Sequence, residues 1–305
     1  MSKAKLCQIK STQTQIKNNI VDINLNSQSG EIVSWQHNGI EITSNPIRPN
    51  FWRPPTDNDL GNRMDKWGKI WQDATYNYKA ILTKEPIINN DQVDYIITYK
   101  LPKDEAKIEA KYSVHPSGRI DVNLSINPNS SDLPNIPRIG MYMTLQNKFN
   151  EVAWYGKGPN ESYWDRKSGQ KTGTYSGLIT GQFHRYPRPQ ETGNKTDVRW
   201  IKLKSDDISL TANGKELLNS SVWPFNMEEI DFNSADAGES ASGLVPVTKK
   251  HGADIKIGKT IQWNIDMQQM GVGGDNSWGS HVHPEYTIPA NKTYHYSFTI
   301  EPKNN

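Results

Sequence analysis

Apolar residues recur at every second position over several stretches of this chain. Residues 120–126 alternate between apolar and polar types, and residues 261–267 and 294–300 repeat the pattern. Because successive side chains of a β-strand point to opposite faces, this spacing predicts strands that are buried on one face and solvated on the other. Shorter runs of the same character predict about fifteen or more strands in all. These runs begin near residues 21, 32, 40, 95, 108, 139, 198 and 208.

The segments between the predicted strands favour antiparallel pairing. Dipeptides such as Asn38-Gly39 are typical of tight hairpin turns. No repeated strand and helix units support a parallel sheet, so we expect an all-β fold, a large antiparallel sandwich. One helix is expected over residues 64–71, where apolar residues are spaced near 3.6 and Gly68 weakens the pattern. Residues 233–243 are the most linker-like segment and are expected to form a surface loop.

Composition excludes several classes of partner. The net charge of +2 gives no electrostatic signature of a protein that binds nucleic acid or an acidic membrane surface. No apolar run approaches the roughly 18 residues that span a bilayer, so we expect a soluble chain. Cys7 is the single cysteine and cannot form an internal disulfide. Of the 10 Trp, we expect about seven or eight in the core.

Common enzyme signatures are missing from the sequence. There is no phosphate loop, no Gly-x-Ser-x-Gly elbow, no Cys-x-x-Cys pair and no His-Glu-x-x-His helix. On a strand, His281 and His283 would share one face at a spacing compatible with a metal, but no third ligand can be assigned. We therefore predict no metal site in this chain.

Three segments rich in aromatic residues and glycine are the strongest candidates for a functional site. Residues 51–61, Phe-Trp-Arg-Pro-Pro-Thr-Asp-Asn-Asp-Leu-Gly, predict a shaped loop in which Gly61 can adopt positive φ; a purely structural turn is an equally good interpretation. In residues 154–166 we expect Asp165 and Arg166 to fix the loop by charge-assisted hydrogen bonds, a structural role.

The third segment, residues 270–278, follows a strongly alternating strand. Its glycines let the chain turn sharply and present Trp278 at a strand end. An exposed indole can stack on the apolar face of a sugar, although a tryptophan that only closes the end of the sandwich would give the same pattern. Glu191, in the Pro-rich segment 187–194, is a possible acid or base, but a structural role is favoured for this lone carboxylate.

These three segments, in this order, identify a resemblance. The chain is similar to the C-terminal domain of the large β-galactosidases of the second glycoside hydrolase family, which also occurs as the separate small subunit of two-chain β-galactosidases. The resemblance runs from about residue 20 to residue 301. It implies a super-sandwich similar to galactose mutarotase, packed against a barrel domain or large subunit that carries both catalytic glutamates.

The resemblance also assigns roles to individual residues. Trp278 matches the tryptophan that stacks on the aglycone sugar in the neighbouring active site, and Gly61 matches the glycine that begins a mobile loop. Asp57, Asn58 and Asp59 match residues that shape the site. The family's magnesium and sodium ions bind in other domains, so no cofactor is expected here. The chain departs from the long enzymes after Gly61, where residues 62–66 form a shorter connection.

We thus expect three regions: an N-terminal extension or first edge strand (1–19), the super-sandwich domain (20–302) and a short tail (303–305). The expected function is that of a β-galactosidase domain or subunit acting on terminal β-D-galactosides such as lactose, inactive by itself. One alternative is a freestanding mutarotase-like or carbohydrate-binding protein that uses Glu191 with His184, His281 or His283. Another is a purely structural domain that provides packing or oligomer contacts. The sequence does not distinguish a cytoplasmic from a periplasmic location.

Overall fold

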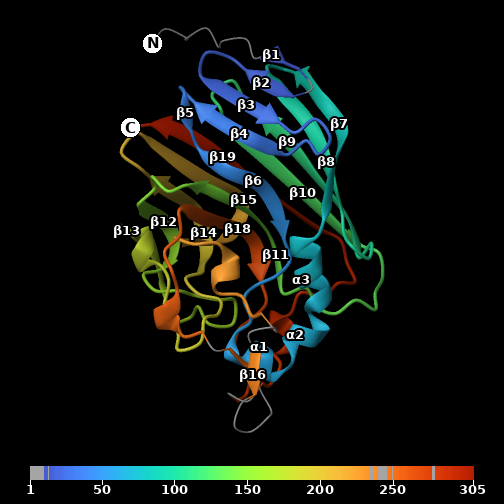
Figure 1. The fold of residues 1–305 in the computed structure, drawn as a ribbon, viewed down its shortest axis with the longest axis vertical. Helices are drawn as coiled ribbons and strands as arrows, with labels where there is room; N and C mark the ends of the chain where they lie inside the picture. The colour runs from blue at the N-terminus through green and yellow to red at the C-terminus, as the bar shows by residue number, and fades with distance from the viewer. Residues whose placement is uncertain (1–9, 13, 234–236, 240–245, 249, 277–278) are drawn as a thin grey trace.

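The structure is a computed structural model that describes residues 10–12, 14–233, 237–239, 246–248, 250–276 and 279–305. Antiparallel strands dominate it, which confirms the all-β prediction (Figure 1). Three short α-helices and several 3-10 turns make up the remaining regular structure of the described residues. The strands form sheets of five, twelve and two strands.

The five-stranded sheet lies at the N-terminal end of the chain (Figure 1). Its strands follow sequence order: β1 (Lys10–Ser11), β2 (Gln15–Lys17), β3 (Val21–Leu25), β4 (Ile32–His37) and β5 (Ile40–Glu41). The predicted N-terminal segment 1–19 therefore supplies two strands, of which β1 is the edge of this sheet.

The twelve-stranded sheet forms the body of the molecule and is branched. One path runs through β13 (Lys171–Leu178), β12 (Glu151–Gly158), β14 (Lys195–Lys204), β15 (Ile208–Trp223), β19 (Tyr294–Asn304), β10 (Ile120–Pro128), β9 (Ala106–Val114), β8 (Gln92–Lys100) and β7 (Lys79–Asn89). A branch leaves β15 through β18 (Thr260–Gln269), β11 (Arg138–Gln146) and β6 (Thr43–Asn50). A separate pair, β16 (Ala237–Glu239) and β17 (Pro246–Thr248), includes part of the segment predicted as a loop.

The branch arises because β15 changes partners along its length. Residues 208–214 pair with β19, whereas residues 219–223 pair with β18. Gly214 lies at the change of partner, where a Cβ atom would be 2.2 Å from the carbonyl oxygen of Glu216. The chain therefore needs a residue without a side chain to turn from one layer into the other.

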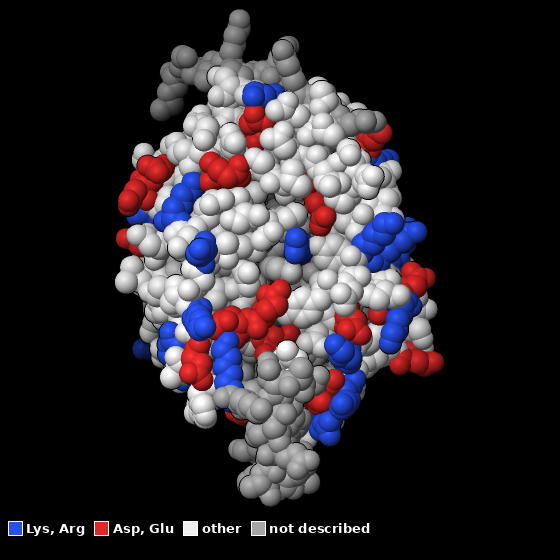
Figure 2. Space-filling model, in the orientation of Figure 1, with Lys and Arg blue, Asp and Glu red and all other residues white. Residues whose placement is uncertain are grey.

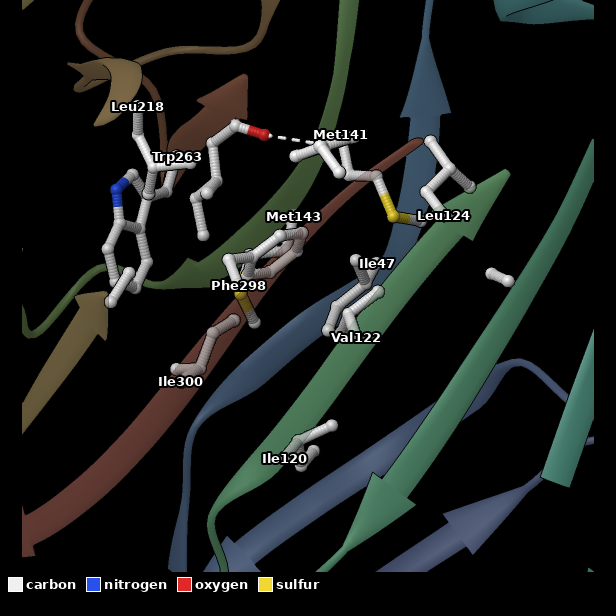
Figure 3. Packing of buried hydrophobic residues seen from close by; sticks show 14 of the residues in the cluster. Ile47, Ile120, Val122, Leu124, Met141, Met143, Leu218, Trp263, Phe298 and Ile300 are labelled. Atoms are coloured by element: carbon white, nitrogen blue, oxygen red, sulfur yellow. Dashed lines mark hydrogen bonds between the residues drawn. The ribbon is translucent and has the colours of Figure 1, made fainter. Parts of the chain in front are cut away.

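The core lies between the two arms of this branched sheet (Figure 3). In this view Leu124 of β10 points toward Met141 of β11, and Val122 of β10 points toward Ile47 of β6. The predicted alternation is confirmed for β10 and β19, whose residues are buried at every second position over 120–126 and 294–300.

Strand β18 differs from the prediction, because both of its faces are covered. Residues 261–266 are all buried. The polar side chains of Gln262 and Asn264 bond to each other at 3.0 Å, and Asn264 donates to Ser221 at 2.8 Å. Internal hydrogen bonds thus replace the solvent that the alternating pattern implied.

Of the tryptophans that the structure describes, six are buried, and Trp67 and Trp164 pack on the core while remaining partly exposed. With these two included, the number of tryptophans in the core agrees with the expected seven or eight.

Three short helices lie away from both chain ends in Figure 1: α1 (Asp57–Gly61), α2 (Met64–Trp67) and α3 (Lys69–Tyr76). The predicted helix is confirmed but is divided at Gly68, while α1 was not predicted. The 3-10 turns are η1 (Ile179–Gly181), η2 (Met227–Glu229), η4 (Gly252–Asp254) and η5 (Pro284–Tyr286).

The carboxylate of Asp231 connects this helical end to the sandwich. It accepts hydrogen bonds from the indole of Trp52 at 2.9 Å, from Gln72 at 3.0 Å and from the hydroxyl of Tyr76 at 2.9 Å. Burial nevertheless raises the pKa of Asp231 to about 6. Through this carboxylate, Trp52 at the beginning of residues 51–61 is joined to α3.

The face shown in Figure 2 carries basic and acidic side chains close to one another, in keeping with the small net charge. Within the described residues, every helix is too short or too polar to cross a membrane.

Candidate functional site

Arg53 anchors the beginning of the glycine-rich segment that follows β18. Its guanidinium donates to the carbonyl oxygens of Met270 at 2.5 Å and Gly271 at 2.8 Å. The same group forms a bidentate pair with Asp59 at 2.9 and 3.0 Å, and both side chains are buried. A buried guanidinium satisfied in this way fixes the two backbone carbonyls against the first segment.

Asp59 has a second role as part of a capping box. Its backbone N–H donates to the hydroxyl of Thr56, and its carboxylate accepts from the N–H of Thr56. This arrangement starts α1 and explains why the segment is helical. The sequence did contain the signal, a threonine followed three residues later by an acid.

Asp165 anchors the next part of the glycine-rich segment. Its two carboxylate oxygens accept from the backbone N–H groups of Val272 at 3.0 Å and Gly273 at 2.7 Å. Asp165 and Arg166 thus both make charge-assisted hydrogen bonds, but not with each other, since Arg166 bonds to Glu161 at 2.5 Å. A tight turn, closed by the bridge between Tyr163 and Arg166, places Asp165 at its tip and Arg166 at its end.

Gly61 lies where the other end of the glycine-rich segment returns to the domain. A Cβ atom on Gly279, which has a φ of +100°, would be 2.1 Å from the carbonyl carbon of Gly61. Gly61 ends α1 and is not among the glycines with positive φ, so that expectation is wrong. Close approach of two backbones, rather than a left-handed turn, characterises this position.

Asp57 and Asn58 occupy the first turn of α1. Asp57 is 67% exposed and accepts from Arg188 at 2.9 Å and from Gln190 at 2.9 Å. Both residues border a cavity of about 250 Å³, whose other lining residues are Thr56, Tyr163, Arg166, Tyr186, Gln190, Glu191 and Val272. All three segments singled out by the sequence, and the segment of Glu191, thus meet at one cavity.

A second, larger cavity borders the beginning of the glycine-rich segment at Met270. Its volume is about 440 Å³, and Trp67, Met270, His281 and Val282 form part of its wall. The indole of Trp67 donates to the side chain of Asn62 at 3.1 Å, which fixes its orientation.

Trp278 itself lies outside the described residues. Its predicted contact with a sugar therefore stays a prediction, as do the site-shaping roles of Asp57, Asn58, Asp59 and Gly61.

Glu191 is buried against Arg138, with which it forms an ion pair at 2.7 Å. Burial raises the pKa of this carboxyl group, and the charge of Arg138 opposes that shift. The imidazole of His184 packs edge-on against Tyr186, and no hydrogen bond or ion pair joins Glu191 to a histidine within the described residues. This arrangement agrees with the structural interpretation of Glu191.

The two histidines considered as metal ligands contact different partners. His281 lies beside the indole of Trp67, at 6.1 Å between ring centroids, and His283 bonds to Asp275 at 2.7 Å. Residues 281–283 form a loop rather than the expected strand. The part of the chain that the structure describes contains no group of three or more potential metal ligands. The hydrogen bond with Asp275 raises the pKa of His283.

Glu161 organises the segment that follows η1. Its carboxylate accepts from the N–H of Gly193 at 2.7 Å, from the hydroxyl of Thr192 at 3.1 Å and from the hydroxyl of Tyr186. Burial alone would raise the pKa of Glu161, but these donors and Arg166 outweigh it and hold the pKa below its ordinary value. Glu161 is therefore a structural anion, and its partners could not be inferred from residue types along the chain.

Comparison with known proteins places the chain in a family. Residues 17–300 match the family described as the beta galactosidase small chain. A β-galactosidase of Priestia megaterium is 33% identical over 280 residues, covering 90% of this chain and 25% of that protein. A β-galactosidase of Lactobacillus delbrueckii subsp. bulgaricus is 31% identical over 291 residues, covering 94% and 27%. The chain thus spans about a quarter of the length of these relatives.

Among solved structures, a galactose mutarotase related enzyme from Lactobacillus acidophilus aligns with a TM-score of 0.48 and 9% identity, over 96% of this chain and 97% of that one. A galactose mutarotase-like protein from Lactobacillus casei aligns with the same TM-score and 10% identity, over 96% and 100%. The sequence match over nearly the whole chain shows that this protein belongs to the β-galactosidase small-chain family.

Proposed function

We propose that the chain is the C-terminal domain or small subunit of a retaining β-galactosidase that hydrolyses terminal β-D-galactosides such as lactose. It would complete the sugar site of a catalytic barrel domain or large subunit without supplying the catalytic glutamates. The observation that carries this proposal is the family match over residues 17–300.

The chain covers only a part of each relative's length, which supports a separate catalytic domain or subunit as its partner. The chain corresponds to 25% of the Priestia megaterium enzyme, which leaves most of such a protein for the catalytic part. A retaining glycosidase needs two carboxyl groups about 5–5.5 Å apart that both reach the substrate. Glu191 and Asp266 are close to one another, because both lie against Arg138, but neither is exposed. Their burial supports placing the catalytic pair elsewhere.

The proposed contribution of this chain is binding. A tryptophan held on a preorganised segment can stack on the apolar face of the leaving sugar and reduce the cost of positioning it. The anchoring of residues 270–273 by Arg53 and Asp165 supports such preorganisation.

Substitution of Trp278 tests the proposed role. In the complete enzyme, Trp278→Ala is expected to raise KM for lactose by roughly five- to thirtyfold, the equivalent of about 1–2 kcal/mol, because the glucose unit loses its stacking partner. KM for an aryl galactoside should change much less. Trp200→Ala, which removes a partly exposed indole from β14, is the matched control and should not separate the two substrates. Equal effects of Trp278→Ala on both substrates would contradict the stacking role.

Assay of the purified chain alone distinguishes this proposal from a freestanding mutarotase-like protein. We expect neither hydrolysis of a chromogenic galactoside nor acceleration of the exchange between galactose anomers, which polarimetry measures. Faster anomer exchange that is lost in Glu191→Gln would instead support the mutarotase-like alternative.

A further inference from the structure

The outer face of the twelve-stranded sheet contains a cavity that the proposed function does not use. Its volume is about 460 Å³, and residues of β8, β9, β10 and β19 line it. Lys215 and Glu216 border it where β15 leaves β19. The cavity shares no lining residue with the two cavities beside the glycine-rich segment, so it is a separate feature of the domain.

Cross-strand pairing places polar residues side by side in the floor of this cavity. Ser297 of β19 pairs with Asn123 of β10, and His295 pairs with Ser125. Residues that pair directly across an antiparallel sheet point to the same face. Their neighbours along each strand are buried in the core, so these four side chains face outward into the cavity.

The polar groups of the cavity are available to another molecule. Six of its residues make no side-chain hydrogen bond or ion pair within the part of the chain that the structure describes: Asn123, Ser125, Lys215, Glu216, His295 and Ser297. The cavity beside the glycine-rich segment differs, because Arg188 and Gln190 already bond to Asp57 there. A ligand can thus replace solvent at these groups without breaking a contact of the domain.

The charges around the cavity favour an uncharged ligand. Lys111 pairs with Asp94 at 3.0 Å, and Glu109 pairs with Lys107 at 3.3 Å. The charged residues at positions 215 and 216 are adjacent in the chain and opposite in sign. An anion or a cation therefore finds no cluster of opposite charge to attract it.

A second cavity of about 260 Å³ extends the first along the same face. Three residues line both cavities: Asn123, Lys215 and Ser297. In the extension, Thr299 of β19 pairs with Asp121 of β10 on one side and with Asn213 of β15 on the other. The first cavity alone has the volume of about fifteen water molecules at about 30 Å³ each. The two cavities, called here the outer groove, therefore have room for more than one sugar unit.

We propose that the outer groove is a second carbohydrate site, which binds an uncharged oligosaccharide apart from the catalytic site. Sugar hydroxyl groups both donate and accept hydrogen bonds, as do the amide, hydroxyl and imidazole groups of the floor. Ile96, a partly exposed apolar residue of the floor, offers a surface to the C–H groups of a sugar ring. Such a site keeps saccharides close to the enzyme without taking part in the reaction.

Binding of lactose and of a β-linked galactotriose to the purified chain tests the proposal. Titrations followed by saturation-transfer NMR should show that both saccharides bind. Asn123→Ala and His295→Ala should each weaken binding by about three- to tenfold, because each removes a hydrogen-bonding group from the floor. Both residues are exposed, so these substitutions should leave the fold intact.

Glu301→Ala is the matched control. Glu301 is exposed on the same face of β19 as His295, but it lines neither part of the outer groove. This variant should bind both saccharides as the natural chain does. Trp278→Ala should also retain binding, because the outer groove contains no residue of the glycine-rich segment.

The outcomes separate this proposal from the proposed function. No measurable binding, or equal binding in the natural chain, Asn123→Ala and His295→Ala, would overturn the outer groove as a site. Competition by inorganic phosphate would overturn the uncharged ligand. Binding that is lost in Trp278→Ala and retained in His295→Ala would also overturn the groove, while the proposed function would stand. Binding that depends on Asn123 and His295 would support the groove even if Trp278→Ala affects lactose and an aryl galactoside equally in the complete enzyme.

Discussion

At Gly140 the structure leaves no room for a Cβ atom. It faces Asp266 across the pair β11 and β18, at a shift in register. A Cβ atom at this position would lie 1.9 Å from Oδ1 of Asp266. The carboxyl group therefore occupies the space that any other residue at position 140 would need.

We expect Gly140→Ala to lower the free energy of unfolding by about 1–3 kcal/mol or more, because the buried carboxyl group must move away from its place beside Arg138. Urea denaturation of the purified chain measures the change. Gly169→Ala is the control, since a Cβ atom there meets nothing within 4 Å. It should alter stability by no more than about 0.5 kcal/mol. Equal losses in the two variants would contradict a steric origin.

At the scale of elements, periodicity predicted the strands but not what covers them. The same alternating pattern describes β10, with one polar face outside, and β18, with its polar face inside. Gln262 and Asn264 are buried, and their polar groups are satisfied by bonds to each other, to Ser221 and to the N–H of Met227. Those partners are distant in sequence, so the pattern alone cannot distinguish a polar face in water from a covered polar face.

The order of the three segments selected them as candidates for a site, and the structure shows that they lie together around the glycine-rich segment. The individual contacts were not predicted: Asp165 bonds to a backbone 107 residues away rather than to its neighbour Arg166. Backbone N–H groups carry no sequence signal, and so the partners of a carboxylate cannot be inferred from residue types.

At the scale of the whole molecule, a buried cluster of charges joins separate parts of the sandwich. Arg138 of β11 lies against Glu191 at 2.7 Å and against Asp266 of β18 at 3.5 Å, and all three side chains are fully buried. One cation thus faces two carboxyl groups. Burial raises the pKa of Asp266 to about 7, an effect that Arg138 opposes and the charge of Glu191 reinforces.

This cluster predicts how the stability of the domain depends on pH. A carboxyl group whose pKa is raised on folding keeps its proton in the folded state after the unfolded chain has released it. The free energy of unfolding should therefore fall as pH rises from about 4 to about 7, by at most about 1.4 kcal/mol per pH unit for Asp266. Asp266→Asn removes this titration, so the variant should gain stability relative to the natural chain across the same range. Urea denaturation at pH 5, 6, 7 and 8 measures the difference. Asp91→Asn, on the exposed turn between β7 and β8, is the control and should follow the natural chain. A parallel dependence on pH in the natural chain and Asp266→Asn would show that Asp266 stays ionised beside Arg138 throughout.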